Sequence, residues 1–347
     1  MKRAVKQRSA RTSALIVGID GGNSKTDILL ADTSGKLLAW VRVSGSNPQG
    51  IGLLPAAALL RSGIDAALAR AKRSGERPAS VALCMAGIDT PRDAKAVRGA
   101  LAGRGSARIA DHLSTRNDSE AGLRVATSDG VGIAIVGGAG VNAIGVNEKG
   151  KTARFAALGD ISGDFGGGGG LSVAALGAAV RAYEGRGPRT SLGRAILRTT
   201  GFPSLRALLD AVLEDRVPHG GIGALGRVLL EESERGDRVA REIETLMIDH
   251  AVAYAVAAQR RAPSRRKRIP IVLIGSTILS SLPGYRSRLY AALIAAIPNG
   301  EVRPLREPPA LGALLYALDE SGAGPTACAR AETSLRAAIK RAKPVKI

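Results

Sequence analysis

Short runs of β-branched and aliphatic residues alternate with longer Ala- and Leu-rich stretches in the first third of the chain. The short runs are typical of strands and occupy residues 14–19, 27–32, 37–43 and 80–86. A helix is expected over about 52–73 and a second one after Pro91, followed by a short strand in SARIADH (106–112). Three strands in hairpin succession, followed by alternating helix and strand, predict a mixed sheet with covering helices.

The same pattern partly repeats in the second half of the chain. Three strands with short turns are expected at 131–136, 141–146 and 151–156, and helices dominate 171–259. One more strand, IPIVLIG at 269–275, precedes helices at about 284–297 and 308–320. The repetition predicts a duplicated α/β fold with a cleft between the copies.

The domain boundaries follow from this repeat. The first domain is expected at 14–116 and the second at 117–320, with the final helix at about 308–320 able to pack back on the first. Residues 1–13 are expected to be a disordered basic tail and 321–347 a second basic tail.

The formal charge of +20 raises the question of a polyanionic partner. Basic residues gather in both tails and in QRRAPSRRKR at 259–268, with no aromatic residues among them that could stack on bases. Charge alone supports only non-specific attraction, so we expect no specific nucleic-acid binding.

Cysteine usage and apolar run lengths indicate the compartment. The chain of 347 residues has two cysteines, Cys84 and Cys328, in no pair motif, which suits a reducing cytoplasm. The apolar run near the N-terminus stops at Asp20, and the uncharged stretches 130–146 and 165–180 are rich in glycine. We therefore expect a cytoplasmic protein without a membrane segment.

One motif match is misleading. GVNEKGKT at 145–152 satisfies the Walker A pattern. A P-loop needs a helix directly after the lysine, because the phosphate sits on the N-terminus of that helix. The alternating run TARFAAL follows instead, so this segment is predicted to be a hairpin turn.

Five other segments combine glycines with polar side chains at the ends of predicted strands. They are DGGNSKT at 20–26, NDSEAGLRVA at 117–126, IVGGAGVNAIG at 135–145, LGDISGDFGGGGG at 158–170 and VLIGST at 272–277. Glycines let backbone N–H groups approach an anion, and hydroxyl groups add further donors. A bland hairpin would need only one or two turn residues, so the crowded tip at 20–26 indicates a binding role.

Taken in this order and spacing, the five segments resemble the actin-like ATPase and sugar kinase superfamily. Within it they look like the BadF/BadG/BcrA/BcrD group, which includes N-acetylglucosamine kinases, over about residues 14–320. The resemblance implies an α/β protein with duplicated actin-like ATPase (ribonuclease H-like) domains flanking an ATP cleft. It also implies an ATP- and Mg²⁺-dependent kinase that phosphorylates a hydroxyl of an amino sugar, most simply N-acetylglucosamine, and that forms a homodimer.

The resemblance assigns the nucleotide and metal contacts residue by residue. Asp20 would hold hydrated Mg²⁺, and Gly275 with Ser276 would receive the adenosine. The phosphates would lie against two loops, formed by Gly21, Gly22, Asn23, Ser24, Lys25 and Thr26 and by Gly138, Ala139 and Gly140. The second loop departs from the family's Ser-Gly-Thr-Gly-Ser pattern, since Gly137, Ala139 and Val141 stand at the hydroxyl positions.

Asp118 matches the family's catalytic base, which would accept the proton of the attacking hydroxyl. The alternative is that Asn117 or Asp118 only caps a helix.

The sugar contacts come from both predicted domains. Gly159, Asp160 and Asp164 match the sugar-binding segment, in which Phe165 replaces the family's glutamate. Asn47 resembles the family's sugar-binding asparagine, although a turn residue before Pro48 would look the same.

Two other functions remain open at this stage. An ATPase that activates a dehydratase would need a cysteine-bound iron–sulfur cluster, which the two cysteines do not favour. A non-catalytic sugar or nucleotide sensor would fit the missing hydroxyl groups around Gly140 and the basic tails.

Overall fold

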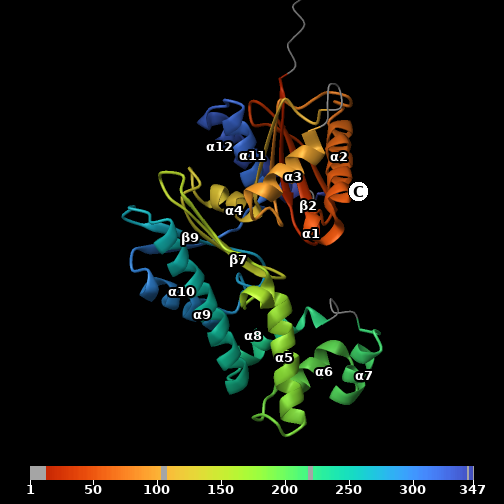
Figure 1. Ribbon diagram of the computed structural model, residues 1–347, viewed down its shortest axis with the longest axis vertical. Helices are drawn as coiled ribbons and strands as arrows, with labels where there is room; N and C mark the ends of the chain where they lie inside the picture. Colours follow the sequence, from red (N-terminus) through yellow and green to blue (C-terminus); the bar gives the residue numbers. More distant parts are fainter. Residues whose placement is uncertain (1–12, 103–107, 218–221, 342–343, 347) are drawn as a thin grey trace, which may run out of the picture. The chain divides into compact units, whose positions relative to one another are not determined.

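The computed structural model describes residues 13–102, 108–217, 222–341 and 344–346. The tail expected at 1–13 therefore lies, apart from Ser13, outside the described residues. The described chain forms two compact units, one from residues of 1–121 and 307–347 and the other from residues of 122–306 (Figure 1).

The first unit is built on a six-stranded sheet with the order β11-β3-β2-β1-β4-β5. Strands β1, β2 and β3 form an antiparallel meander, and β4 and β5 run parallel to β1. All six residues of β4 are buried, as expected for a central strand that reads as a continuous apolar run. The strands are β1 (Leu15–Gly21), β2 (Lys25–Asp32), β3 (Leu37–Ser44), β4 (Ser80–Met85), β5 (His112–Asn117) and β11 (Val345–Lys346).

Helices cover both faces of this sheet. Helices α2 and α3 lie on one face, and α11 lies on the other with α12 beside it (Figure 1). The helices are α1 (Pro48–Ile51), α2 (Leu53–Arg70), α3 (Pro91–Ala102), α11 (Ala310–Glu320) and α12 (Pro325–Arg341). Helix α4 (Asp118–Ala126) begins in the first unit and carries the chain into the second.

The second unit repeats the plan. Its five-stranded sheet has the order β10-β9-β6-β7-β8, with an antiparallel meander β6-β7-β8 and with β9 and β10 parallel to β6. The strands are β6 (Gly132–Gly137), β7 (Val141–Val146), β8 (Thr152–Arg154), β9 (Ile269–Ile274) and β10 (Gly300–Pro304). Since β3-β2-β1-β4-β5 and β8-β7-β6-β9-β10 agree in order and direction, the predicted duplicated α/β fold is confirmed.

The helices of the second unit bury its largest apolar core. Helix α9 packs on β6, β7 and β8, and α10 packs on α9 and β10. Helices α5 to α8 extend this core away from the sheet (Figure 1). The helices are α5 (Gly168–Tyr183), α6 (Leu192–Thr200), α7 (Leu205–Leu213), α8 (Leu225–Glu234), α9 (Arg238–Arg261) and α10 (Pro283–Ala296), preceded by a 3₁₀ turn, η2 (Gly159–Ser162).

Three parts of the structure differ from the sequence-based expectations. The strand expected within 106–112 lies at His112–Asn117, where its partly exposed residues lack an apolar run. Strand β10 was not expected, because its five residues are only partly buried or exposed. The segment set apart as a basic tail contains α12, which buries Ala327, Cys328, Ala331 and Leu335 along one side.

No helix among the described residues is both long and apolar enough to cross a bilayer.

Helix α11 approaches other backbone closely at two glycines, with strand β1 at one of them and with helix α4 at the other. A Cβ added at Gly18 in β1 would lie 2.1 Å from the Leu314 nitrogen, and one at Gly312 would lie 1.9 Å from the Ala121 carbonyl oxygen. Only glycine permits such an approach, so Gly18 sets the distance between α11 and the sheet, and Gly312 sets the distance between α11 and α4.

We expect Gly312→Ala to lower the free energy of unfolding by about 1–3 kcal/mol, because backbone must move to admit the methyl group. The matched control is Gly99→Ala in α3, where an added Cβ meets nothing within 4 Å. That substitution should stabilise the protein by about 0.5–1 kcal/mol. Urea denaturation of both variants measures the difference, and equal effects would contradict the close packing of α11.

Candidate active site

The carboxyl ends of three parallel strands meet at one edge of the first sheet. Gly21, Met85 and Asn117 lie in register at the ends of β1, β4 and β5. Loops that follow parallel strands at such an edge commonly carry the site in α/β proteins. Asp20 and the hairpin tip thereby come to the same edge as the start of α4.

At the tip of the first hairpin, some of the polar side chains are exposed and others are buried. Asn23, Ser24 and Lys25 are exposed, and the Gly22 nitrogen donates to the Lys25 carbonyl at 2.9 Å. Thr26 is fully buried, and its hydroxyl donates to the Ser46 hydroxyl at 2.7 Å. The structure therefore does not place the Thr26 hydroxyl among the exposed donors of the tip.

Asp20 is partly exposed at the end of β1, in surroundings that disfavour its charge. Burial raises the pKa of Asp20 from 3.8 to about 8, and the negative charges of Asp118 and Asp27 add to the shift. Asp27 pairs with Asp20 across the strands and is itself held by Trp40 Nε1 at 3.0 Å and by two Arg42 nitrogens at 2.8 Å. This concentration of carboxylates favours a cation at Asp20.

Asp118 is the first residue of α4, and the side chain that caps this helix belongs to the preceding residue, Asn117. The Asn117 Oδ1 atom accepts from the Ser119 nitrogen at 3.1 Å, which is the capping interaction. Asp118 is partly exposed, and burial followed by the charge of Asp89 raises its pKa to about 6. Such a carboxyl group is well suited to exchange a proton near neutral pH.

Hydrogen bonds between side chains join the loops at this edge. Asn47 Nδ2 donates to Asn23 Oδ1 at 2.6 Å, and Asn117 Nδ2 donates to Asp89 Oδ1 at 2.9 Å. Gln49 Nε2 lies 3.3 Å from Asp89 Oδ2 and connects the two pairs. Four loops of the first unit are thus fixed relative to one another.

Asn47 is also the cap of α1, since its Oδ1 accepts from the Gln49 nitrogen at 2.9 Å. A Cβ added at Gly87 would lie 2.2 Å from Asn47 Oδ1, so glycine is required there. Asn47 therefore has the local structural role that the sequence left open, as the cap of a short helix. Its predicted role in sugar binding stays a prediction. Asp89, Gln49 and Gly87 were not predicted, although Asp89 lies in the loop that follows the buried strand β4.

In the second unit, three of the glycine-rich segments are brought into direct contact. The Gly168 nitrogen donates to the Gly138 carbonyl at 2.8 Å, and the Gly169 nitrogen donates to the Ala139 carbonyl at 3.0 Å. The Thr277 hydroxyl donates to the same Gly138 carbonyl at 2.8 Å. The loop at 137–140 is thus held by the start of α5 and by the turn after β9.

Gly275 lies against this loop with a φ of +100°, and its added Cβ would lie 2.6 Å from the Gly137 carbonyl oxygen. A left-handed backbone and a close approach both demand glycine at this position.

Beside Ser276 lies a cavity of about 490 Å³, within the size range of small-molecule sites. Its wall combines apolar and polar groups from the start of α5, from α8 and from the turn after β9. The lining residues are Gly168, Gly223, Gly226, Arg227, Leu230, Glu231, Ser276, Thr277, Leu279, Ser280, Ser281 and Leu282.

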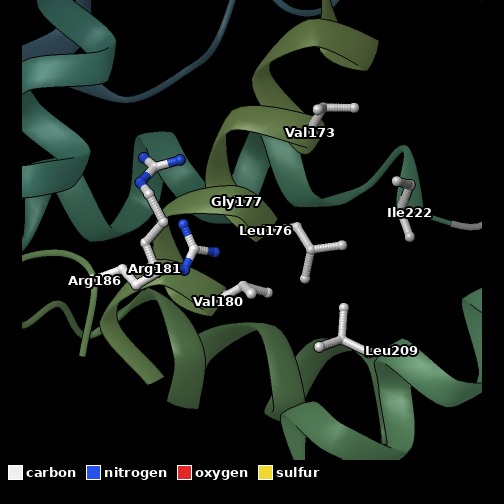
Figure 2. A pocket seen from close by; sticks show the side chains of 8 residues that line it. All are labelled: Val173, Leu176, Gly177, Val180, Arg181, Arg186, Leu209 and Ile222. Carbon is white, nitrogen blue, oxygen red and sulfur yellow. The ribbon is translucent and has the colours of Figure 1, made fainter. Parts of the chain in front are cut away.

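A second concavity, of about 320 Å³, differs in character (Figure 2). Figure 2 shows Val173, Leu176 and Val180 of α5 on one side of the groove and Leu209 of α7 on the other, with arginines at one end. It contains none of the residues predicted for the site, so the cavity at Ser276 is the better candidate for a nucleotide.

Gly159, Asp160 and Asp164 lie in the segment between β8 and α5. Gly159 and Asp160 are exposed in η2. Asp164 is partly buried, and its carboxylate accepts from the Gly159 nitrogen at 3.1 Å and from the hydroxyls of Ser162 and Tyr254.

The Walker-like segment forms a hairpin. Val146 ends β7, Asn147 Oδ1 accepts from the Lys149 and Lys151 nitrogens at 3.0 Å, and Thr152 begins β8. A strand, and not a helix, follows Lys151, so this segment is not a P-loop.

Comparison with known proteins identifies a family and two related kinases. Residues 17–317 match the model of the BadF/BadG/BcrA/BcrD ATPase family. An N-acetylmuramic acid/N-acetylglucosamine kinase of Clostridium acetobutylicum is 24% identical over 305 residues, which cover 88% of this chain and 98% of that protein. An N-acetyl-D-glucosamine kinase of Dictyostelium discoideum is 25% identical over 319 residues, with the same two coverages of 88% and 98%.

Among solved structures, a protein of Chromobacterium violaceum assigned as an N-acetylglucosamine kinase superposes with a TM-score of 0.66. It is 22% identical, and the match covers 88% of this chain and 99% of that one. This likeness supports the mixed α/β fold with two sheets.

Asn117→Ala should lower the free energy of unfolding by about 1–3 kcal/mol, because it removes the cap of α4 and the amide group that donates to Asp89 Oδ1. Asp118→Asn should not lower it, and at pH 7 should raise it by about 1 kcal/mol after allowing for solvent screening, because the folded protein disfavours the ionised carboxyl group. Urea denaturation of the two variants makes the comparison. The reverse order of effects would identify Asp118 as the structural residue.

Stability of the metal-free protein should depend on pH through Asp20. Between about pH 4 and pH 8 the folded unit keeps a proton on Asp20 that the unfolded chain has released, so stability falls as pH rises. We expect Asp20→Asn to be more stable than the parent protein at pH 9 by about 1–2 kcal/mol, after allowing for solvent screening, and similar at pH 4. Denaturation in EDTA at both pH values tests this, and parallel curves for the two proteins would contradict it.

Proposed function

Because the chain belongs to the BadF/BadG/BcrA/BcrD ATPase family, we propose that it transfers the γ-phosphate of ATP to a hydroxyl of an amino sugar. N-acetylglucosamine is the first choice of acceptor, and the two relatives named as kinases of this sugar support that choice. The observation that carries the proposal is Asp118, a partly exposed carboxyl group with a pKa of about 6 whose helix is capped by its neighbour.

In the proposed mechanism, Asp118 orients the attacking hydroxyl and accepts its proton as the phosphoryl group is transferred. Burial and, to a smaller extent, the negative charge of Asp89 raise the pKa of Asp118, which suits a base that must take up a proton and later release it.

The phosphates would be bound by backbone and polar groups of each unit. In the first unit the exposed donors are Asn23, Ser24 and Lys25, of which Lys25 supplies a positive charge that is 3.7 Å from Asp27. In the second unit the loop at 137–140 has no hydroxyl side chains, so its N–H groups would bind the phosphate. Adenosine would occupy the cavity beside Ser276, in the turn that Gly275 allows to pack against the loop at 137–140.

Mg²⁺ fits the residues at the end of β1. Asp20 offers the hard oxygen ligand that this ion prefers, and a divalent cation there would offset the mutual repulsion of Asp20, Asp118 and Asp27. Among the described residues, no group of three or more acidic, histidine or cysteine side chains is arranged to hold a metal. Asp20 would therefore hold an ion that keeps its waters and neutralises phosphate charge.

The sugar would be bound by Asn47 of the first unit and by Gly159, Asp160 and Asp164 of the second. Asn47 uses its oxygen for the α1 cap and one amide hydrogen for Asn23, which leaves one amide hydrogen for a ligand.

The dehydratase activator is less well supported. Its cluster needs cysteines that can reach iron, whereas Cys84 is fully buried in β4 and Cys328 is buried in α12. Burial also raises the pKa of the Cys84 thiol, which disfavours the thiolate that a metal requires.

A coupled assay of ADP release across a panel of hexoses and hexosamines tests the proposed reaction. Turnover that depends on an added amino sugar supports the kinase. Binding of ATP and sugar without turnover would instead identify a sensor. The homodimer, the cytoplasmic location and the lack of specific nucleic-acid binding stay predictions, of which sedimentation velocity measures the first.

Asp118→Asn should reduce the rate of sugar phosphorylation by roughly 10²–10⁴-fold, the usual contribution of a positioned general base. Binding of ATP and sugar should persist, since the loss is confined to the transition state. Steady-state kinetics and calorimetric binding on the same preparation make the measurement. A folded variant with near-parental turnover would remove Asp118 from the mechanism.

A further inference from the structure

Tyr254, in the middle of α9, contacts both ends of the segment that joins β8 to α5. Its ring meets the ring of Phe155 edge to face, with centroids 5.0 Å apart and an interplanar angle of 85°. Its hydroxyl donates to Asp164 Oδ1. The side chain is only 8% exposed, so one buried tyrosine anchors residues 155 and 164 together.

Between these anchors the segment is exposed. Leu158 and Ile161 are 54% and 88% exposed, and an added Cβ at Gly163 would meet nothing within 4 Å. Ala157, Gly159 and Gly163 have left-handed φ values of +51°, +62° and +72°. A segment with so few packing contacts in its middle depends on its ends for its position.

The carboxylate of Asp164 has a defined number of acceptor positions. An ionised carboxylate accepts about four hydrogen bonds. Two donors, the Gly159 nitrogen and the Ser162 hydroxyl, reach Oδ2, and the Tyr254 hydroxyl reaches Oδ1. The remaining position lies on Oδ1, beside the tyrosine hydroxyl, and its direction is set by that hydroxyl.

We propose that Tyr254 is a positioning residue of the sugar subsite, which orients the Asp164 carboxylate and anchors the loop that carries Asp160. This inference rests on the proposed function for its substrate. Tyr254 acts through Asp164, and its effect therefore falls on sugar binding more than on the chemical step. A carboxylate that is already oriented binds a hydroxyl without the cost of ordering it first.

The test uses Tyr254→Phe, which removes one oxygen and keeps the ring packed on Phe155. The KM for the sugar should rise about 10- to 100-fold, the range for loss of a hydrogen bond to a charged group. The KM for ATP and kcat should change less than about 3-fold, and the melting temperature should stay near that of the parent. An unchanged KM for the sugar overturns the proposal.

The matched control is Tyr285→Phe. Tyr285 is a fully buried tyrosine of the same unit whose hydroxyl lies 3.5 Å from the Ile278 carbonyl oxygen. The Tyr285→Phe variant should leave kcat and the KM values for ATP and for the sugar unchanged. Equal effects of the two variants would attribute the result to general loosening of the unit and overturn the role of Tyr254.

A second measurement does not need the reaction. Hydrogen exchange of residues 155–164 in the ligand-free protein should be faster in Tyr254→Phe than in the parent, and unchanged in Tyr285→Phe. Unchanged exchange in Tyr254→Phe overturns the anchoring. If exchange rises but no sugar is phosphorylated by the parent protein, the anchoring stands and the proposed function fails.

A double variant tests whether Tyr254 acts through Asp164. In an Asp164→Ala background, Tyr254→Phe should raise the KM for the sugar by less than about 2-fold further, because the group that it orients is gone. Independent, multiplicative effects would show that Tyr254 does not act through Asp164.

Discussion

Carbonyl groups of the loop at 137–140 hold two distant segments of the second unit, the start of α5 and the turn after β9, against this loop. The Gly137 carbonyl accepts from the nitrogen of Thr277, and the Gly138 carbonyl accepts from the hydroxyl of Thr277 and from the nitrogen of Gly168. Glycine is required at positions 275 and 167, because an added Cβ would lie 2.6 Å from the Gly137 carbonyl oxygen at the first and 2.5 Å from the Gly140 backbone at the second. The start of α5, the end of β9 and the cavity beside Ser276 are arranged around this loop.

The first unit uses a different principle at the corresponding edge of its sheet. There the organising interactions are between side chains, from Asn23 through Asn47 and Gln49 to Asp89 and Asn117. These bonds fix loops that carry Asp20 and Asp118, whose pKa values are both raised. Carboxylates held together at a cost in electrostatic energy are typical of sites that bind cations or exchange protons.

Most strands were predictable because each is either a continuous apolar run or half of a tight hairpin. Strand β9 and the meander β6-β7-β8 lie within two residues of the expected positions. Strand β5 and strand β10 were misplaced or missed, since their partly exposed residues give no apolar run and each is an edge strand that pairs in parallel with one neighbour. The sequence predicts a tail in place of α12, because this helix is rich in basic residues and buries only a narrow side of mostly small side chains.

The predicted site residues are those that follow strands with glycine or carboxylate in a short motif. Tyr254 lies within a helix and has no such motif, and its partner lies 90 residues away along the chain. Asp89 follows strand β4, but its partner Asn117 lies 28 residues away, so the sequence gives no sign of their contact. Likewise, the sequence left open whether Asn117 or Asp118 caps α4, since both residue types suit the position. Only the geometry of the Asn117 amide decides between them.

The first unit is discontinuous in the chain, and this has a consequence for synthesis on the ribosome. Its sheet needs α11, which packs on β1 and β4 but is encoded after the whole of the second unit. The second unit, residues of 122–306, can therefore complete its core while the first still lacks the cover of one sheet face. The second unit is then the first to fold, although it begins later in the chain. Until residue 320 has emerged, the uncovered face of the first sheet needs protection from premature contacts.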